Sequence, residues 1–361
     1  MAVQRALVGV AAAVAAGPAL ARRVVRSPVV ELSTVADDLA VVHRGAEVRT
    51  YTDLAPDTDY VLDGVDVRTL PRPGQLLAVF ATVNDVHFGE VECGVLGGLS
   101  APTFRSSPGA EPYPVVMNRG AVTEIRAIEP AAVVVKGDLT SDGTVEQYDE
   151  FLACYADAFG ERLHHIRGNH DGYHGGNFAP TGPFEVVLPG VRLALIDTTR
   201  TGAASGAIAA DQLEWLDELA ARSDRPVLVL GHHHVWHPDL DPVGDWFFGI
   251  DPDDSVRLAE IVARRTAIVG YSAGHTHRNR VVRLPATGAV PWGEVACVKD
   301  FPGSWAEYRV FDGGILQVHR RISTAPALDW SERTRHMYGG MYRDYAFGHL
   351  RDRCFPVGLA S

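Results

Sequence analysis

The sequence predicts a layered fold of mixed helices and strands, of the α/β or α+β class. Short apolar runs bounded by polar turn residues fit strands that are covered on both faces. Between these runs lie segments in which apolar residues recur at helical spacing. The apolar runs are residues 76–83, 131–135, 163–167, 227–230 and 267–269. With 361 residues, 46% of them hydrophobic, the chain is long enough for one large domain with additions or for two domains.

Residues 1–28 form an alanine-rich N-terminal segment with two interpretations. After Arg5, the stretch from Ala6 to Ala21 is typical of a signal peptide that ends in small residues. Arginines directly behind the stretch oppose export, because such positive charge tends to stay on the cytoplasmic side. The stretch is also too short and too rich in alanine for a membrane span. We expect a cytoplasmic protein without a membrane span, or an exported one if residues 1–21 are a signal peptide.

Residues 29–72 are predicted to form a small antiparallel β unit. Alternating segments such as 40–43 and 47–51 are separated by turn residues. The stretch from Leu54 to Tyr60 resembles a late-strand motif of fibronectin type III domains, although the unit is only about half as long as such a domain. Residues 71–74 then form a short stiff linker.

The elements beyond the linker are predicted from local patterns. Thr144 opens a capping box, and Gly160 ends the helix that follows it. Residues 88–120 form a long insert rich in Gly, Ser and Pro, between His87 and a helix that we expect at about Gly120. We assign this insert to the substrate rim or to a surface loop. The other predicted elements are a helix at 213–219, a hairpin of strands 184–188 and 191–196, and strands at 294–298, 306–311 and 315–322.

A C-terminal tail at 323–361 lacks clear periodicity. We expect its aromatic-rich stretch at 337–345 to pack on the domain, with a cover over the site or a subunit contact as alternatives. The formal net charge of −12 disfavours broad binding to nucleic acid, which requires a basic face. The four cysteines are scattered without Cys-x-x-Cys spacing, which argues against a zinc ribbon and a disulfide framework.

Clusters of histidine and carboxylate residues lie at or just beyond the ends of the apolar runs. They are Asp85-Val86-His87, Gly137-Asp138, Gly168-Asn169-His170-Asp171, Gly231-His232 and Gly274-His275-Thr276-His277. Carboxylate, amide and imidazole groups suit a pair of divalent metals. A spacing of two residues at a strand end, as in the first and last clusters, puts both side chains on one side. Each cluster alone also fits a surface pair or an ordinary turn, whereas the ordered set predicts one joint metal site.

This ordered set resembles the signature of the calcineurin-like metallophosphoesterase family. Gly137-Asp138-Leu139-Thr140, with Gly143 and the helix that follows, is most similar to the branch of class III cyclic nucleotide phosphodiesterases. The resemblance implies a metallophosphoesterase domain at 75–322. It also implies a two-sheet β-sandwich flanked by helices, in four layers, with the site at the carboxyl ends of the strands.

The resemblance further implies a role for each site residue. The implied metal ligands are a bridging Asp138, with Asp85, His87 and His277 for the first metal and Asn169, His232 and His275 for the second. His170 is the implied proton donor to the leaving group, and Asp171 is expected to keep its imidazole charged and oriented. Three further histidines are predicted to lie at the rim and to bind substrate or water, or to have no function: His233, His234 and His237.

The implied reaction is hydrolysis of a phosphate ester by a hydroxide that bridges two metals. The expected partner is a small phosphate ester, and first among these a phosphodiester such as a cyclic nucleotide. A phosphomonoesterase, a pyrophosphatase, a nuclease and a non-catalytic scaffold are the alternatives. Two divalent or trivalent ions of iron, manganese or zinc would accept this ligand set. No stable nucleic-acid partner is expected, and a homodimer is left open.

Overall fold

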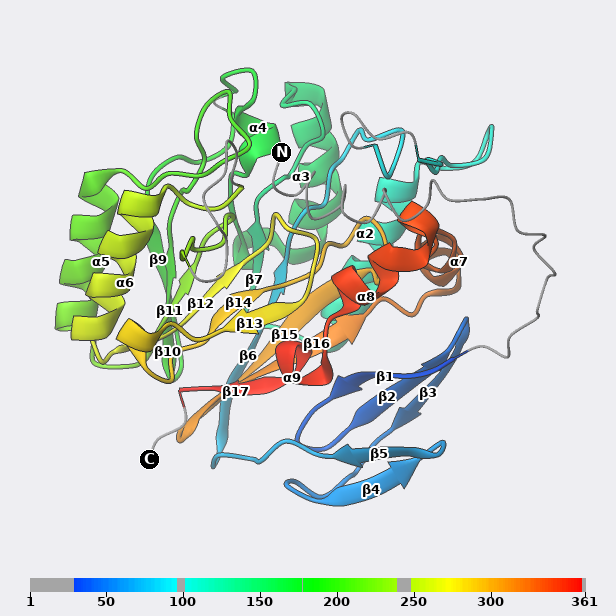
Figure 1. Cartoon of the computed structure of the whole chain (residues 1–361), viewed down its shortest axis with the longest axis horizontal. Helices are drawn as coiled ribbons and strands as arrows, with labels where there is room; N and C mark the ends of the chain where they lie inside the picture. Colours follow the sequence, from blue (N-terminus) through cyan, green and yellow to red (C-terminus); the bar gives the residue numbers. More distant parts are fainter. Residues whose placement is uncertain (1–28, 96–100, 177, 239–247, 359–361) are drawn as a thin grey trace.

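The structure is a computed structural model that describes residues 29–95, 101–176, 178–238 and 248–358 (Figure 1). The N-terminal segment, with its two interpretations, lies outside these residues. Within them, no helix is long and apolar enough to cross a membrane.

Two six-stranded sheets form the centre of the described part of the chain. The first contains, in spatial order, β13 (Arg280–Val282), β14 (Trp292–Glu294), β12 (Ile268–Ala273), β11 (Val227–Leu230), β10 (Val191–Leu195) and β9 (Phe184–Leu188). The second contains β17 (Phe355–Val357), β16 (Gly314–Arg321), β15 (Ser304–Phe311), β6 (Leu76–Val83), β7 (Ala132–Lys136) and β8 (Leu163–Ile166). Strands β10, β11 and β12 run parallel, as do β6, β7 and β8, so their carboxyl ends meet at one edge of each sheet.

Side chains of both sheets meet in a buried apolar layer. Phe80 of β6 stacks on Tyr308 of β15 with ring centroids 4.6 Å apart, and Leu193 and Leu228 of the first sheet join the same cluster. On β6, Phe80 faces this layer while Ala81 and Val83 face the helices, because successive side chains of a strand point to opposite faces. Strands covered on both faces explain the continuous apolar runs.

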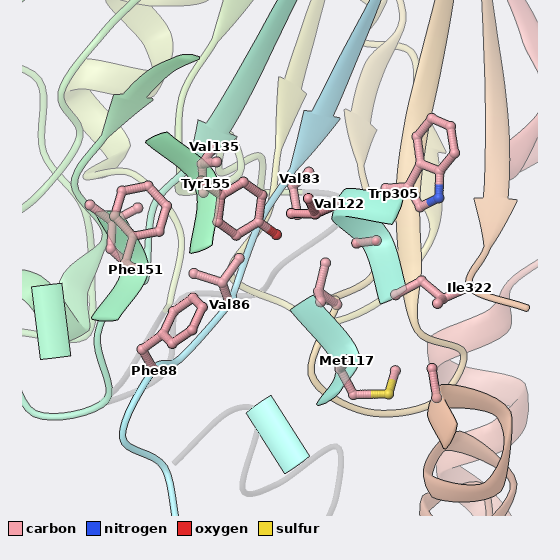
Figure 2. Close-up of a cluster of buried hydrophobic side chains, with 14 of the residues drawn as sticks. Val83, Val86, Phe88, Met117, Val122, Val135, Phe151, Tyr155, Trp305 and Ile322 are labelled. Atoms are coloured by element: carbon pink, nitrogen blue, oxygen red, sulfur yellow. The ribbon is translucent and has the colours of Figure 1, made fainter. Parts of the chain in front are cut away.

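Helices cover the outer faces of the two sheets (Figure 1). Helices α5 (Ala210–Arg222) and α6 (Pro252–Arg264) pack on the first sheet. Helices α2 (Tyr113–Ala127), α3 (Val145–Phe159) and α7 (Ala325–Thr334) pack on the second, and Figure 2 shows part of this core, with Phe151 and Tyr155 of α3 near Val135 of β7. The predicted four-layer sandwich of mixed helices and strands is therefore confirmed.

Two local predictions were wrong. The helix that we expected near Gly120 begins at Tyr113, because Pro112 and Pro114 suit its first turn, so the insert is shorter than predicted. The strand expected at 294–298 ends at Glu294, and the next residues form a loop. By contrast, the N-cap of the expected capping box is confirmed, since Thr144 Oγ1 accepts a hydrogen bond from the Gln147 amide at 3.3 Å. The reciprocal bond is not formed, because Oε1 of Gln147 accepts the amide of Asp142 instead.

The N-terminal β unit consists of a three-stranded sheet and a hairpin. The sheet contains β1 (Val30–Val35), β2 (Ala40–Arg44) and β3 (Glu47–Tyr51), and the hairpin contains β4 (Asp59–Leu62) and β5 (Val65–Arg68). Figure 1 shows this unit against the edge of the sandwich, where β1 contacts β16.

The segment after Ile322 is part of the sandwich. After α7 it contains η3 (Met337–Gly340), α8 (Met341–Phe347), α9 (Leu350–Arg353) and β17, which pairs with β16. The predicted boundary at 322 therefore falls inside the packed layers. The remaining short helices are η1 (Gly160–Arg162), α4 (Asn169–Gly172) and η2 (Pro285–Thr287).

Candidate metal centre

All seven predicted metal ligands lie in loops that follow parallel strands or, for Asn169, at the start of a short helix there. The loop after β6 carries Asp85 and His87, and the loop after β7 carries Asp138. The ligands that follow β8, β11 and β12 are Asn169, His232, His275 and His277. These loops converge because the strands of each sheet end at the same edge.

Asp138 lies between the two predicted ligand sets. Its Oδ2 is 3.4 Å from Nε2 of His87, and its Oδ1 is 3.4 Å from Nε2 of His232. The potential ligand atoms of Asp85, His87 and His277 lie within 4.8 Å of one another, as do those of Asp85, Asp138 and His232. A carboxylate that faces two ligand sets with different oxygens has the arrangement that a bridging ligand requires.

The second set is held in place by hydrogen bonds. Nδ1 of His232 donates to the carbonyl oxygen of Lys136 at 2.8 Å, which leaves Nε2 as the nitrogen that faces Asp138. Oδ1 of Asn169 lies 3.0 Å from the same Nε2. His275 belongs with His232 to a compact group of potential ligand atoms.

Buried nitrogens at this site show that its residues fit metal ions. In the described ranges, neither ring nitrogen of His87 has a hydrogen-bond partner, and Nδ1 of His275 has none. Buried polar atoms are nearly always partnered, so such atoms require an explanation. A metal ion would accept a lone pair from each imidazole, and the neighbouring carboxylates would offset its charge.

The electrostatics of the site favour neutral ligands around a cation. Burial lowers the pKa of His87 to about 4 and holds those of His275 and His277 well below the usual range, so these imidazoles are neutral near pH 7. Burial also disfavours the charged form of His232, but the Asp138 carboxylate outweighs it and raises the pKa of His232 to about 9. Positive charge is therefore favoured on His232 and disfavoured on His87, His275 and His277.

The backbone at the site is strained. Asp85, His87, Asp138, His275 and His277 all have positive φ, between 48° and 67°. Residues with a Cβ rarely adopt this conformation, and such residues cluster at functional sites where the surrounding structure holds them. Both oxygens of Asp85 accept the amide of His275 at 3.0 Å, which ties the first loop to the last.

The glycines at the start of three ligand clusters allow the loops to approach closely. A Cβ on Gly137 would lie 2.5 Å from Nδ1 of His232, and one on Gly274 would lie 2.7 Å from Cβ of Asn84. A Cβ on Gly168 would collide with the Asp138 amide and carboxylate. The Gly-Asp, Gly-Asn and Gly-His pairs of the sequence therefore have a packing reason, because any side chain there would push the loops apart.

His170 and Asp171 follow Asn169, and the role expected of Asp171 was wrong. Nδ1 of His170 lies 2.6 Å from the carbonyl oxygen of Ser141, so this oxygen orients the imidazole. The carboxylate of Asp171 instead accepts hydrogen bonds from the amides of Leu139, Thr140 and Gly168 and from the Thr140 hydroxyl. Asp171 fixes the loop that carries Asp138 and does not hold the His170 ring.

The prediction of a rim position was also wrong for His233. This residue is fully buried, with Nδ1 2.8 Å from Thr198 Oγ1 and its ring 4.6 Å from that of His275. It lies within reach of the second ligand group. His234 lines a separate small cavity. His237 is half-buried and does not line the cavity that opens beside the candidate ligands.

A cavity of about 240 Å³ opens beside the ligands. His87, Asp138 and His170 line one part of it. Its other lining residues include several that the sequence did not assign to the site: Glu90, Tyr173, Lys299, Asp300, Tyr338, Tyr342 and Tyr345. The aromatic stretch at 337–345 was the available signal for the last three, whereas Lys299 and Asp300 belong to no recognisable motif.

Comparison with known proteins gives a consistent result. A family model described as calcineurin-like phosphoesterase matches residues 79–279, more than half of the chain. A probable cyclic nucleotide phosphodiesterase of Synechococcus sp. is 25% identical over 177 residues, which is 44% of this chain and 66% of that protein. A cAMP/cGMP dual specificity phosphodiesterase of Mycobacterium tuberculosis is 28% identical over 162 residues, 42% of this chain and 49% of that protein.

The aligned region thus spans only part of these curated relatives, between about half and two thirds of their length. Among solved structures, a dimetal phosphatase from Danio rerio has a TM-score of 0.53 and 17% identity, with 69% of this chain and 98% of that chain covered. This likeness supports the fold.

Proposed function

From the premise that this chain belongs to the calcineurin-like phosphoesterase family, we propose that it hydrolyses a small phosphodiester at a dinuclear metal centre. The observation that carries the proposal is the position of Asp138, whose two oxygens face His87 and His232 at 3.4 Å each. That arrangement suits two ions side by side. Two such ions would acidify a water molecule and neutralise the phosphate oxygens.

The ligands of the chain divide into two sets around Asp138. Asp85, His87 and His277 would hold one ion, and Asn169, His232 and His275 the other. Metal-loading experiments would identify the two ions, because iron, manganese and zinc all accept nitrogen and oxygen ligands of this kind.

His170 would protonate the leaving oxygen. Since the Ser141 carbonyl can only accept, Nδ1 of His170 carries a proton, and Nε2 is the nitrogen free to exchange one with substrate. His170 also lines the cavity beside the ligands. The backbone amide of His170 donates to Oδ1 of Asp138 at 2.9 Å, which fixes the distance between the acid and the bridging carboxylate.

A cyclic nucleotide is the substrate that we favour. The relatives include proteins named as cyclic nucleotide phosphodiesterases. The cavity of about 240 Å³ is near the lower end of the roughly 300–1,000 Å³ typical of small-molecule sites, which suits a single small nucleotide better than a polymer.

The test is a turnover screen of protein reconstituted separately with iron, manganese and zinc. Substrates would include cyclic AMP, a nitrophenyl phosphodiester, a nitrophenyl phosphomonoester and a nucleotide sugar. We expect the highest kcat/KM on phosphodiesters, and no turnover by Asp138→Ala. Faster hydrolysis of the monoester or the pyrophosphate would reject the phosphodiesterase assignment, and no turnover in any metal form would reject the hydrolase.

A further inference from the structure

We propose that the C-terminal segment from Met337 to Tyr345 forms a binding wall for the base of a mononucleotide, an inference that rests on the proposed phosphodiesterase function. This segment lies more than 50 residues beyond the part of the chain matched by the family model, which ends at residue 279. It nevertheless contributes Tyr338, Tyr342 and Tyr345 to the cavity beside the metal ligands.

The three tyrosines form one continuous aromatic surface. The ring centroids of Tyr338 and Tyr342 are 6.0 Å apart, and those of Tyr342 and Tyr345 are 6.1 Å apart. Tyr342 is only 5% exposed, whereas Tyr338 and Tyr345 are half-buried and present ring surface to the cavity. Aromatic side chains of this kind bind bases by stacking, whatever the base.

One hydrogen bond joins this surface to the loop that carries two candidate ligands, and a second joins it to Asp300 in the loop after β14. The Tyr345 hydroxyl donates to the carbonyl oxygen of Thr276, the residue between His275 and His277, at 2.8 Å. The Tyr342 hydroxyl donates to Oδ1 of Asp300 at 2.6 Å. The wall is thereby held in a fixed position relative to the candidate ligands His275 and His277, and such preorganisation lowers the cost of binding.

The backbone around Tyr338 supports a binding role. Tyr338 has a φ of 51°, and Gly339 and Gly340 follow with φ of 70° and 92°. A non-glycine residue in this conformation is rare and occurs mainly at functional sites. The turn places the Tyr338 ring at the cavity, among the lining residues that also include the paired charges of Lys299 and Glu90, 2.6 Å apart. These charges offer a donor and an acceptor to the polar edge of a base.

The experiment compares substrates with and without a base on metal-loaded protein. The variants are Tyr338→Ala, Tyr338→Phe and a control, Tyr60→Ala, in the N-terminal hairpin. The substrates are cyclic AMP and the 3′,5′-cyclic phosphate of ribose without a base. We expect Tyr338→Ala to lower kcat/KM on cyclic AMP by roughly 5- to 150-fold, the range for loss of one stacking contact. The base-free substrate should change less than about twofold, and Tyr338→Phe should resemble wild type.

A binding measurement separates this inference from the proposed function. Calorimetry should show that AMP binds wild type more tightly than ribose 5-phosphate, and that Tyr338→Ala abolishes the difference. This result would support the wall even if the protein turned over no phosphodiester. Absence of phosphodiester turnover would reject only the proposed function. Equal losses on both cyclic substrates, or an unchanged preference for AMP in Tyr338→Ala, would overturn the inference.

Discussion

At the scale of single residues, the two oxygens of Asp138 face different histidines at 3.4 Å each. We expect wild-type protein to bind two metals per chain, and Asp138→Ala to retain less than one, because in the proposed site the same carboxylate would serve both ions. Elemental analysis after gel filtration measures this. Asp149→Ala, on the exposed face of α3, is the control and should retain both metals. A single metal in active wild-type protein would contradict the dinuclear site.

His170 allows a test of acid catalysis. His170→Ala should keep its metals but lose roughly 10²–10⁴-fold in rate on an alkyl phosphodiester, whose leaving alkoxide needs a proton. A nitrophenyl phosphodiester leaves as a stable phenolate, so its rate should fall much less. The measurement is kcat on both substrates at saturating metal.

Equal losses on the two substrates, with chemistry rate-limiting and metals retained, would make His170 a phosphate-binding residue. Ser141 contributes only its backbone carbonyl to His170, so Ser141→Ala serves as a matched control and should leave the ratio of the two rates unchanged.

The seven residues predicted as metal ligands lie together in the structure, whereas the partners of the residues beside them were not predicted. These candidate ligands could be found because carboxylate and imidazole groups at strand ends meet wherever parallel strands end together. Asp171 was misassigned because adjacent residues of a helix do not face each other, so Asp171 and His170 on α4 point to different partners. The burial of His233 was missed because a run of three histidines gives no sign in the sequence of how far each side chain is buried, and His232, His233 and His234 are all buried.

At the scale of elements, the loops of the site require glycine at defined positions. In Gly168→Ala the new methyl group would collide with the amide and carboxylate of Asp138. We expect this variant to lose metal affinity and about 1–3 kcal/mol of unfolding free energy, the usual cost of overpacking. Gly293→Ala is the control, because its Cβ would have no neighbour closer than 3.5 Å. Metal titration and thermal melts measure both effects, and equal behaviour of the two variants would contradict the packing argument.

The accuracy with which the ends of helices and strands were predicted depended on how specific the local sequence signals are. The helix after Thr144 was predicted correctly because capping residues mark both of its ends. The C-terminal elements were missed because their order comes from contacts with distant strands: β17 has three residues, and its pairing with β16 is formed only in the folded chain. Short strands of this kind have no periodicity from which they could be predicted.

At the scale of the whole molecule, Glu31 connects the N-terminal sheet to the C-terminal helices. Its buried carboxylate lies 2.5 Å from Arg335 and 2.8 Å from Arg343. We expect Glu31→Gln to destabilise the protein by about 3 kcal/mol, because it removes a buried counter-charge that the half-buried Arg335 and Arg343 share. Glu332 still pairs with Arg335 at 2.8 Å, which holds the loss at this end of the range for a broken buried pair. Chemical denaturation measures this. Glu47→Gln, which breaks an exposed pair with Arg49, should cost less than about 1 kcal/mol, and similar values for both variants would contradict the role of burial.

The same contact between N-terminal sheet and sandwich makes stability depend on pH through His43. Its imidazole is fully buried, with Nδ1 2.9 Å from Ser33 Oγ and Nε2 3.2 Å from Ser323 Oγ. Burial, together with the positive charge of Arg321, lowers the pKa of His43 to about 3, against an ordinary value of 6.5. In the unfolded chain His43 therefore binds a proton below about pH 6.5, whereas in the folded chain it binds one only near pH 3.

The stabilising contribution of neutral His43 is thus complete above pH 6.5 and is lost progressively as the pH falls towards 3. Between pH 7 and pH 5 we expect wild type to lose about 2 kcal/mol of unfolding free energy through this residue. His43→Gln cannot take up the proton, so its stability should fall by that much less over the same interval. Urea denaturation of both proteins at pH 7, 6 and 5 measures the difference.

Glu31 titrates below this pH interval in the folded protein. Burial raises the pKa of Glu31, but pairing with Arg335 and Arg343 outweighs burial and lowers the pKa to about 2. Parallel pH profiles for the two proteins would show that folding leaves the pKa of His43 unchanged, and that the N-terminal sheet does not depend on a neutral imidazole for its attachment.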